Sequence, residues 1–553
     1  MNRIRVLAVA AAVLALAAAC SSSGTNTSTS SKVGGVLTIS NESGGLWTCG
    51  FNPFNPSDTT LSIGTVYEPL VFVNALKSGA TTPWLASKYQ WAPDNRSLTF
   101  TIRDGVKWTD GQPMTADDVV FTFQLMKAHS ALDLNAVWSV LTGVTKQGSN
   151  QVVMTFNGPA VPYFYYIADQ VGIVPQHVWS KITGDPGAYV DASPVGTGPY
   201  TVSPCTPQNI TYVRNPHYWQ PGLPKIAKVL YPAYTSNDPA NLDLATGKAQ
   251  WGSQFIPDIN SFYSSKSPDH HYWFPPLTNV SIFPNLKVAP LDDKVVRQAI
   301  AYGINRDQVS KVAEYGYEPP ANQSGIVTPT YQSWLDQGQA STAGYTYNVA
   351  KAQSLLQGAG YTKGSDGIYV SPAGKRLSFS IINIGDYSDW VASVREVTNN
   401  LKAVGIELKA ENLSSDDYDN RLYNGKFDLA YGAETGGPTP YYEFRQWLYS
   451  KNGAPIGQQA STNWERYSAP GTDQLLEQYG GTTDPKTQKQ IMNQLQTVML
   501  NDVPVIPVTE GVDWYQYNTQ NISGWVTQND PFAQPAAFAV PDIEVMLLHL
   551  QPK

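Results

Sequence analysis

The sequence predicts an α/β fold of mixed (α+β) architecture that is divided into several domains. Segments with strand character and segments with helix character alternate along the chain, which favours mixed layers over an all-α or an all-β fold. About 520 residues follow the N-terminal leader, more than one core usually organises, so two or three domains are expected. The apolar fraction of 42% is sufficient to fill their cores.

Four segments have the composition of β-strands. β-branched and aromatic residues alternate or cluster in them, and turns rich in Pro, Gly and Asn separate them. These predicted strands are residues 35–40, 97–103, 151–156 and 210–214.

Four further segments predict amphipathic helices. One starts with Thr115 as the N-cap, followed by two aspartates that suit the positive end of a helix. A second starts at Asp292, where apolar residues recur at intervals of four. The other two are expected over residues 387–404 and 484–500.

The first 19 residues have the pattern of a signal peptide. Two arginines precede an apolar run from Val6 to Ala19, which is too short for a membrane span of roughly 20 residues. The run stops at Cys20, as in bacterial lipoproteins, so we expect cleavage before Cys20 and a lipid on its thiol. An ordinary secretory signal is the alternative, because Leu16 lies four residues before the cysteine instead of the usual three.

Residues 20–31 are expected to form the lipidated cysteine and a flexible tether. They consist almost entirely of Ser, Thr, Gly and Asn, which bury little apolar surface. No later segment of the sequence has the composition of a membrane span. We therefore expect a soluble chain on the outer face of the cytoplasmic membrane, attached only through its lipid.

Charge and composition exclude several function classes. The net charge is −8 and basic residues form no block, which argues against nucleic acid or an anionic membrane surface as a partner. No CxxC or HExxH pattern occurs, and adjacent His270 and His271 would point to opposite faces of a strand. We therefore expect neither a metal site nor a cofactor. The 15 Trp and 32 Tyr residues suggest a lined cavity.

Several long motifs carry a family resemblance. They are LTFTIRDGVKWTDGQPMTADDVVFTF at residues 98–123, GTGPY at 196–200, RNPHYW at 214–219 and VVRQAIAYGINRD at 295–307. In sequence and order they resemble family 5 extracellular solute-binding proteins, the receptors of ABC importers that bind dipeptides, oligopeptides, nickel or oligosaccharides. The resemblance extends from Gly34 to the C-terminus.

The resemblance implies a periplasmic-binding-protein-like fold with two ligand-clasping lobes, a hinge and an extra domain II. Domain I would comprise residues 32–70, 195–283 and 508–553, domain II residues 71–194, and domain III residues 284–507. Crossings near residues 283–285 and 507–510 would form the hinge. A monomer would enclose its ligand between domains I and III and deliver it to the permease, with energy from a partner ATPase.

Two cysteines remain once Cys20 is assigned to the lipid. In an exported protein an even pair is more often bonded than free. The resemblance places Cys49 and Cys205 in domain I, so a disulfide is expected, with two free buried thiols as the alternative.

The ligand-binding loop departs from the pattern of the peptide-binding members. Those proteins pair the peptide ammonium group with an Asp in a loop that follows a strand of domain III. Here the loop is residues 433–440, and Gly436 occupies the position of that Asp; Ser415 replaces a Trp of the oligopeptide receptors. A buried amine needs a counter-charge. Glu434 could supply it; otherwise the ligand is neutral at this point.

Aromatic residues around the expected cleft would suit a sugar ligand. The group comprises Trp47, Trp390, Tyr441, Tyr442, Trp447 and Trp514, and core packing is the alternative for each one. We expect a peptide ligand first, because peptide receptors predominate in the family, and an oligosaccharide second. No His lies in a plausible cleft loop, which disfavours nickel.

An exported glycoside hydrolase is the hypothesis from a different class. Asp416, Asp417, Asp419 and Glu434 could provide a carboxylate pair, although spacing alone does not identify one. The sequence contains no GxSxG elbow and no GxxxxGK[ST] loop. We therefore expect a receptor and not an enzyme.

The lipid anchor gives a first testable prediction. Cys20→Ala should release the protein from the membrane without changing its folding, because the tether contributes no core residues. Membrane fractionation and thermal unfolding measure the two effects. If the variant stays membrane-bound after a high-salt wash, the anchor lies elsewhere.

Overall fold

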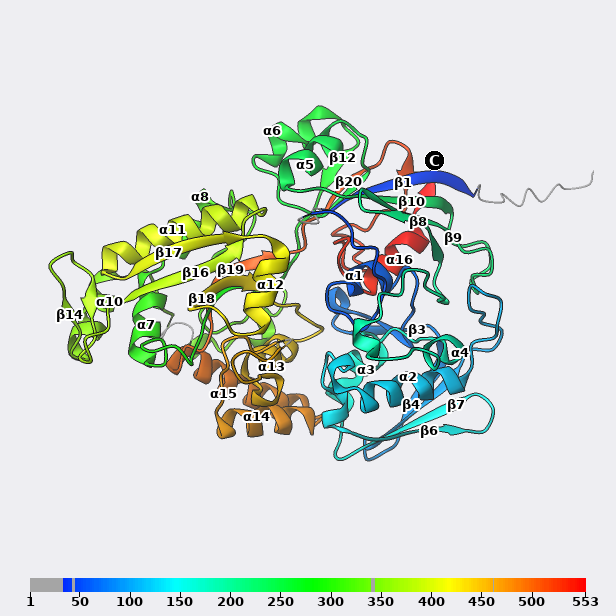
Figure 1. Cartoon of the computed structure of the whole chain (residues 1–553), viewed down its shortest axis with the longest axis horizontal. Coiled ribbons are helices and arrows are strands. Elements are labelled where there is room, and N and C mark those ends of the chain that lie inside the picture. The colour runs from blue at the N-terminus through cyan, green and yellow to red at the C-terminus, as the bar shows by residue number, and fades with distance from the viewer. Residues whose placement is uncertain (1–32, 42–44, 340–343, 461) are drawn as a thin grey trace, which may run out of the picture. The chain divides into compact units, whose positions relative to one another are not determined.

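The computed structural model describes residues 33–41, 45–339, 344–460 and 462–553, and its mixed α/β fold confirms the predicted class (Figure 1). Three large sheets organise this part of the chain, and we name the region built on each one a lobe. Lobe I has the seven-stranded sheet, lobe II the four-stranded sheet and lobe III the five-stranded sheet. None of the helices in these residues is long and apolar enough to cross a bilayer.

The sheet of lobe I draws strands from distant parts of the sequence. β1 lies near its centre and pairs in parallel with both β10 and β11. The order is β12 (His270–Tyr272), β20 (Gln516–Asn518), β11 (Trp251–Gly252), β1 (Gly34–Ser40), β10 (Ile226–Pro232), β9 (Asn209–Arg214) and β8 (Tyr200–Thr206).

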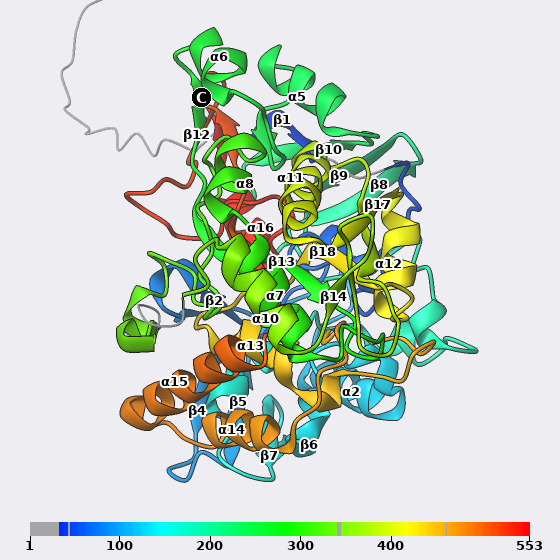
Figure 2. The ribbon, with the colours of Figure 1, turned by 90° about the vertical axis from the view of Figure 1, so that its left-hand side faces the viewer.

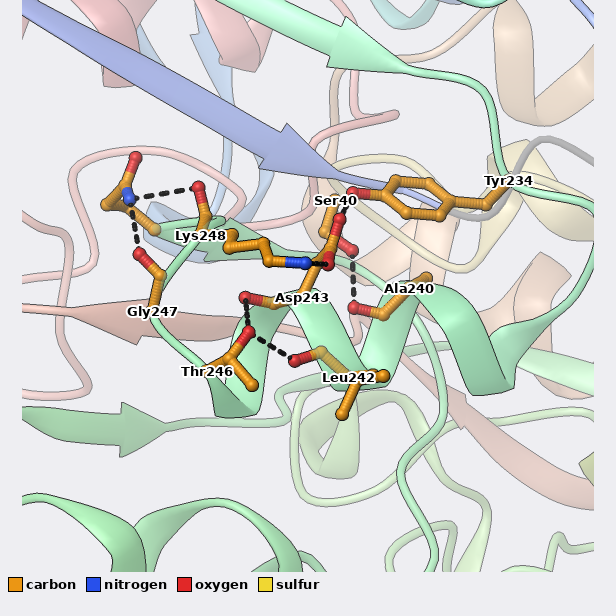
Figure 3. A network of polar contacts seen from close by, with 9 residues as sticks. Ser40, Tyr234, Ala240, Leu242, Asp243, Thr246, Gly247 and Lys248 are labelled. Carbon is orange, nitrogen blue, oxygen red and sulfur yellow. Dashed lines mark hydrogen bonds and ion pairs between the residues drawn. The ribbon is translucent and has the colours of Figure 1, made fainter.

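Side-chain hydrogen bonds fix helix α5 (Asn237–Ala245) beside the end of β1 (Figure 3). The hydroxyl of Ser40 donates to the carbonyl of Ala240 at 2.9 Å. The Asp243 carboxylate accepts from the Tyr234 hydroxyl at 3.0 Å and from the Lys248 ammonium at 3.1 Å. The first turn of α5 also reaches lobe III, where Asn237 donates to the hydroxyl of Ser388 at 3.3 Å.

Lobe II is an antiparallel sheet covered by helix α2 (Ala116–Ala128). Its strands are β4 (Ala86–Trp91), β5 (Ser97–Ile102), β7 (Gln151–Phe156) and β6 (Leu141–Gln147), in that order. Thr115 caps α2 as predicted: its hydroxyl accepts the N–H of Asp117, and Asp118 accepts the N–H of Thr115. Two further elements, β2 (Val71–Asn74) and α3 (Phe164–Ala168), belong to this stretch of chain.

Lobe III has helices on both faces of its sheet. The strand order is β17 (Glu407–Leu413), β16 (Ser378–Ile384), β18 (Leu429–Ala433), β13 (Pro276–Pro284) and β19 (Ile506–Val512). Figure 2 shows α7 (Lys294–Gly303), α10 (Val349–Gly358) and α11 (Ser388–Val404) together, and their apolar residues share one core. Residues of the opposite face pack with α12 (Ser415–Tyr423), α13 (Tyr441–Leu448), α14 (Pro470–Gly480) and α15 (Pro485–Asn501).

The predicted helix starts agree with the observed ones to within two residues. α11 begins directly after Tyr387, and α15 begins after Asp484, whose carboxylate caps it by accepting the N–H of Thr487. α7 begins at Lys294, later than predicted. The N-cap is Asp293 and not Asp292, because the carboxylate of Asp293 accepts the N–H of Val295.

The predicted hinge positions, near residues 283–285 and 507–510, need correction. β13 and β19 pair with each other and belong to the sheet of lobe III, whereas β12 and β20 belong to lobe I. The two crossings therefore lie at residues 273–275 and 513–515. The predicted domain boundaries at residues 283 and 508 would assign β13 and part of β19 to domain I. The backbone hydrogen bonds of both strands place them in the sheet of lobe III.

Cys49 and Cys205 form a disulfide bond whose Cα atoms lie 5.8 Å apart. Cys205 belongs to β8 of lobe I, and the bond closes a loop across a sequence separation of 156 residues that includes all of lobe II. Cys20 lies outside the described residues.

Removal of this bond should destabilise the fold. On the chain-entropy model, the Cys49→Ser/Cys205→Ser double variant loses roughly 4–5 kcal/mol of unfolding free energy, because its denatured chain is less restricted. Denaturant unfolding under non-reducing conditions measures the loss. The contradicting result would come from a chain with Cys20 replaced and both other cysteines kept. If that chain showed two reactive thiols when denatured without a reductant, Cys49 and Cys205 would not be bonded.

Candidate ligand-binding site

A pocket of about 300 Å³ separates residues 55–57, which precede α1 (Thr59–Ser62), from helix α12 of lobe III. The loop is fixed to lobe I, because the Tyr212 hydroxyl of β9 donates to the carbonyl of Leu61 at 2.7 Å. The lining is polar, and the described residues that form it include no Lys, Arg or His. It comprises Asn55, Pro56, Ser57, Asp416, Asp419, Asn420, Tyr423, Asn424 and Gln459.

Helix α12 presents its acidic residues to this pocket. Ser414 caps the helix by accepting the N–H of Asp417 at 3.3 Å. Asp416 and Asp419 of the same helix line the pocket. Burial raises the pKa of Asp419 to about 6, and the nearby Asp416 carboxylate adds to the shift. The pocket therefore offers hydrogen-bond acceptors and negative charge, without a positive group for a ligand carboxylate.

Glu434 follows β18 and lies close to Tyr418 and Tyr423. Burial raises the pKa of both tyrosines, and the Glu434 carboxylate adds to the rise. It is 5% exposed, and among the described residues no side chain donates to its carboxylate. Burial raises its pKa far above the usual range, and Glu465 and Glu443 add to the shift, while the backbone N–H of Asn463 opposes it. Glu434 therefore favours a proton or an approaching cation.

Glu465 is a second buried carboxylate of the same kind. It is fully buried, and burial raises its pKa well above the usual range, with partial opposition from Arg466. Neither Glu434 nor Glu465 forms an ion pair within the described part of the chain. By contrast, the carboxylate of Glu443 accepts hydrogen bonds from Thr278 and Asn279. Glu434 and Glu465 therefore differ from Glu443, because no side chain among the described residues donates a hydrogen bond to either carboxylate.

Gly436 has no room for a side chain. A Cβ atom at this position would lie 2.5 Å from the carbonyl oxygen of Leu277, so an aspartate would force the backbone apart. The loop of residues 433–440 therefore cannot present a carboxylate here in its observed conformation. Any charge that it offers a ligand must come from Glu434.

Three of the aromatic residues singled out in the sequence make packing contacts. Trp447 is fully buried and lies against Phe444 in lobe III. Tyr441 and Tyr442 contact residues of lobe II: the rings of Tyr442 and Tyr166 are 5.0 Å apart. Core packing was the stated alternative for this group.

The other three tryptophans also lie outside the pocket lining. Trp47 donates its indole N–H to the carbonyl of Tyr231, and Trp514 packs against Phe274 beside one crossing. Trp390 contacts Tyr418 of α12, the helix that lines one side of the pocket. Asn55, Ser57 and Gln459 line the pocket without any sequence signal, since their positions depend on how distant segments meet.

A second acidic cluster lies where lobes I and III touch. Glu314, Glu318 and Asp389 are all buried, and Ser393 and Thr509 donate to the first two at 2.6 Å. Burial raises the pKa of Glu318 to about 8 and that of Asp389 to about 6, and the carboxylates repel one another. Beside them, Ser388 accepts a hydrogen bond at 3.3 Å from Asn237 of lobe I.

Comparison with known proteins places this geometry in a family. Residues 80–455 match the bacterial extracellular solute-binding proteins, family 5. The fold matches a Thermotoga maritima periplasmic oligopeptide-binding protein with bound mannohexaose: TM-score 0.87, 26% identity, 94% of this chain and 98% of the other. It also matches Bacillus subtilis AppA with a nonapeptide, at TM-score 0.80 and 19% identity over 95% and 100% of the two chains. The Escherichia coli dipeptide-binding protein is 24% identical over 83% of this chain and 86% of its own.

The chain therefore belongs to the family 5 bacterial extracellular solute-binding proteins. Members of this family are the substrate-binding proteins of ABC importers; they are solute receptors and not enzymes.

The second acidic cluster, formed by Glu314, Glu318 and Asp389, predicts how the stability of the fold depends on pH. Because the pKa of Glu318 is higher in the folded state, its contribution to stability is complete below about pH 4.5 and is lost as the pH rises through about 8. The free energy of unfolding should fall between pH 5 and pH 8, by on the order of 1 kcal/mol or more. Urea unfolding at several pH values measures this.

Glu318→Gln should reduce that fall, because the amide cannot ionise. Glu407→Gln is the control, since the pKa of Glu407 is lowered, chiefly by the hydroxyl of Ser378, and it stays ionised over this range. A Glu318→Gln variant with the full pH dependence of the parent would show that the cluster does not cause it.

Proposed function

We propose that this protein is the lipid-anchored, extracytoplasmic binding subunit of an ABC importer, which captures a short oligomeric solute between lobes I and III and delivers it to the permease. Membership of family 5 supports the general role. The observation that carries the location is the polar pocket between residues 55–57 of lobe I and α12 of lobe III. A ligand held there touches both lobes, so it can stabilise the closed state.

The ligand that the pocket suits best is an oligosaccharide. Its lining offers amides, carboxylates and a tyrosine, which match sugar hydroxyls, but no cation that could hold the carboxylate of a peptide. Protonated carboxyl groups such as Glu434 can both donate to hydroxyl groups and accept from them. The mannohexaose in the T. maritima relative agrees with this choice.

A peptide is the second candidate, and the sequence alone ranked it first. Two observations favour it: the names of the E. coli and B. subtilis relatives, and the unpaired Glu434 carboxylate, which could receive an ammonium group. The two ligand classes differ in what they require of Glu434. A sugar needs only a hydrogen-bonding group, whereas an amine needs the negative charge.

Binding to variants of Glu434 should separate the two classes. With a sugar, Glu434→Gln should cost only about 1 kcal/mol, because the amide still accepts a hydrogen bond. With a peptide, the cost should be about 2–5 kcal/mol, because a buried charge pair is broken. A thermal-shift screen of cello-, xylo- and manno-oligosaccharides against di- to pentapeptides finds the ligand, and calorimetry measures its affinity.

Two aspartates of α12 provide a matched comparison. Asp419→Asn should weaken binding, because Asp419 lines the pocket, whereas Asp417→Asn should not, because Asp417 is exposed and lies off the lining. Parent-like affinity in both Asp419→Asn and Glu434→Gln would place the site elsewhere. Conversion of the ligand during the assay would instead favour the hydrolase hypothesis.

A further inference from the structure

Helix α13 joins lobe III to lobe II immediately after the loop of residues 433–440. All eight of its residues are buried, and they face two ways. Glu443 accepts a hydrogen bond from Asn279 of lobe III, and the Trp447 ring lies beside Gly325 of the same lobe. Tyr441, Tyr442 and Arg445 face lobe II, so α13 is packed between the two lobes.

Arg445 is a buried cation whose charge acts on the nearby Asp133 carboxylate, where it opposes the rise in pKa that burial causes. It is 2% exposed and forms no ion pair among the described residues. Its guanidinium carbon lies 5.1–5.3 Å from the ring centres of three tyrosines, which we call the tyrosine cage: Tyr163 and Tyr166 of lobe II and Tyr449 of lobe III. One guanidinium nitrogen also donates to the carbonyl of Asn135 in lobe II at 3.2 Å.

The two lobes therefore complete the surroundings of this cation jointly. If lobe II moved away, Arg445 would lose two rings and the Asn135 carbonyl and would be hydrated instead. A cation–π contact is stronger when it is dry, but burial of the charge opposes it. The rings and the carbonyl offset part of the cost of burying the charge, so the contact depends on lobe II staying in place.

The contact between lobes II and III also holds the C-terminal part of the loop of residues 433–440. At its C-terminal end, the Tyr442 hydroxyl donates to the carbonyl of Pro162 at 2.7 Å, and the Tyr166 hydroxyl donates to the carbonyl of Tyr442 at 3.4 Å. Within the loop, Pro438 lies close to Gly79 of lobe II, where a Cβ atom would be only 3.3 Å away. Lobe II thus supports the segment that begins with Glu434.

We propose that Arg445 and Tyr442 are positioning residues for ligand capture: through the tyrosine cage and Pro162 they fasten lobe III to lobe II and keep the receptor closed over its ligand. This inference rests on the proposed function, because it requires a solute that is held between lobe III and the rest of the receptor. Lobe II then acts as part of the clamp and not as a passive insertion.

Two tyrosine variants with matched chemistry test the proposal. Tyr442→Phe removes a 2.7 Å hydrogen bond between lobes, and Tyr345→Phe removes a 2.7 Å hydrogen bond to Leu500 within lobe III. Tyr442→Phe should raise the ligand dissociation rate about three- to tenfold with little change in association, and Tyr345→Phe should leave it unchanged. Arg445→Met should raise the dissociation rate by about tenfold or more.

A distance measurement without ligand keeps the test independent of ligand identity. Spin labels at Gln147→Cys of β6 and Lys409→Cys of β17, in a Cys20→Ala background, report the separation of lobes II and III. Arg445→Met should shift the distribution to longer distances, and Tyr345→Phe should not. A parent-like distribution and parent-like dissociation in Arg445→Met would overturn the proposal. If the parent binds no solute and Arg445→Met still shifts the distances, only the proposed function is refuted.

Discussion

A two-stranded ribbon between lobes I and III is the constraint on which the rest of the structure depends. β12 and β20 pair in lobe I, and β13 and β19 continue as a pair in lobe III. Hydrogen bonds also bridge the crossings, from the N–H of Trp273 to Tyr515 and from the N–H of Asp513 to Pro275. A ribbon of this kind can twist and bend while its strands stay paired, so the lobes can move without losing their relative register.

The ribbon also explains why the acidic clusters lie where they do. The buried Glu318 carboxylate accepts a hydrogen bond from Thr509 of β19, and Glu434 follows β18, the neighbour of β13. Both groups are held on the lobe III sheet near its contacts with the other lobes. A carboxyl group buried without a cation either holds a proton or can bind a positive or hydroxyl-rich group. Such groups cost folding stability, and they are common at ligand-binding sites.

The polar pocket and α13 each lie between a different pair of lobes. The pocket brings amides of lobe I to aspartates of lobe III, whereas α13 brings tyrosines of lobe II to Arg445. Polar contacts with a solute supply specificity, and aromatic contacts between lobes supply the remaining contact area of a closed state. Of the aromatic residues expected to bind ligand, Tyr441 and Tyr442 contribute instead to the second contact.

The sequence by itself determined the fold class, the family, and most element positions, because capping residues such as Thr115 and Asp484 and the alternation within residues 151–156 act locally. It also identified Glu434 and Gly436 as departures from the peptide-binding pattern. Only the tertiary structure decided that Gly436 has no space beside Leu277, that the crossings lie beyond β13 and β19, and that Asn55 and Asp419 line the same pocket. These facts depend on which distant segments pair and pack, and local propensity carries no information about such contacts.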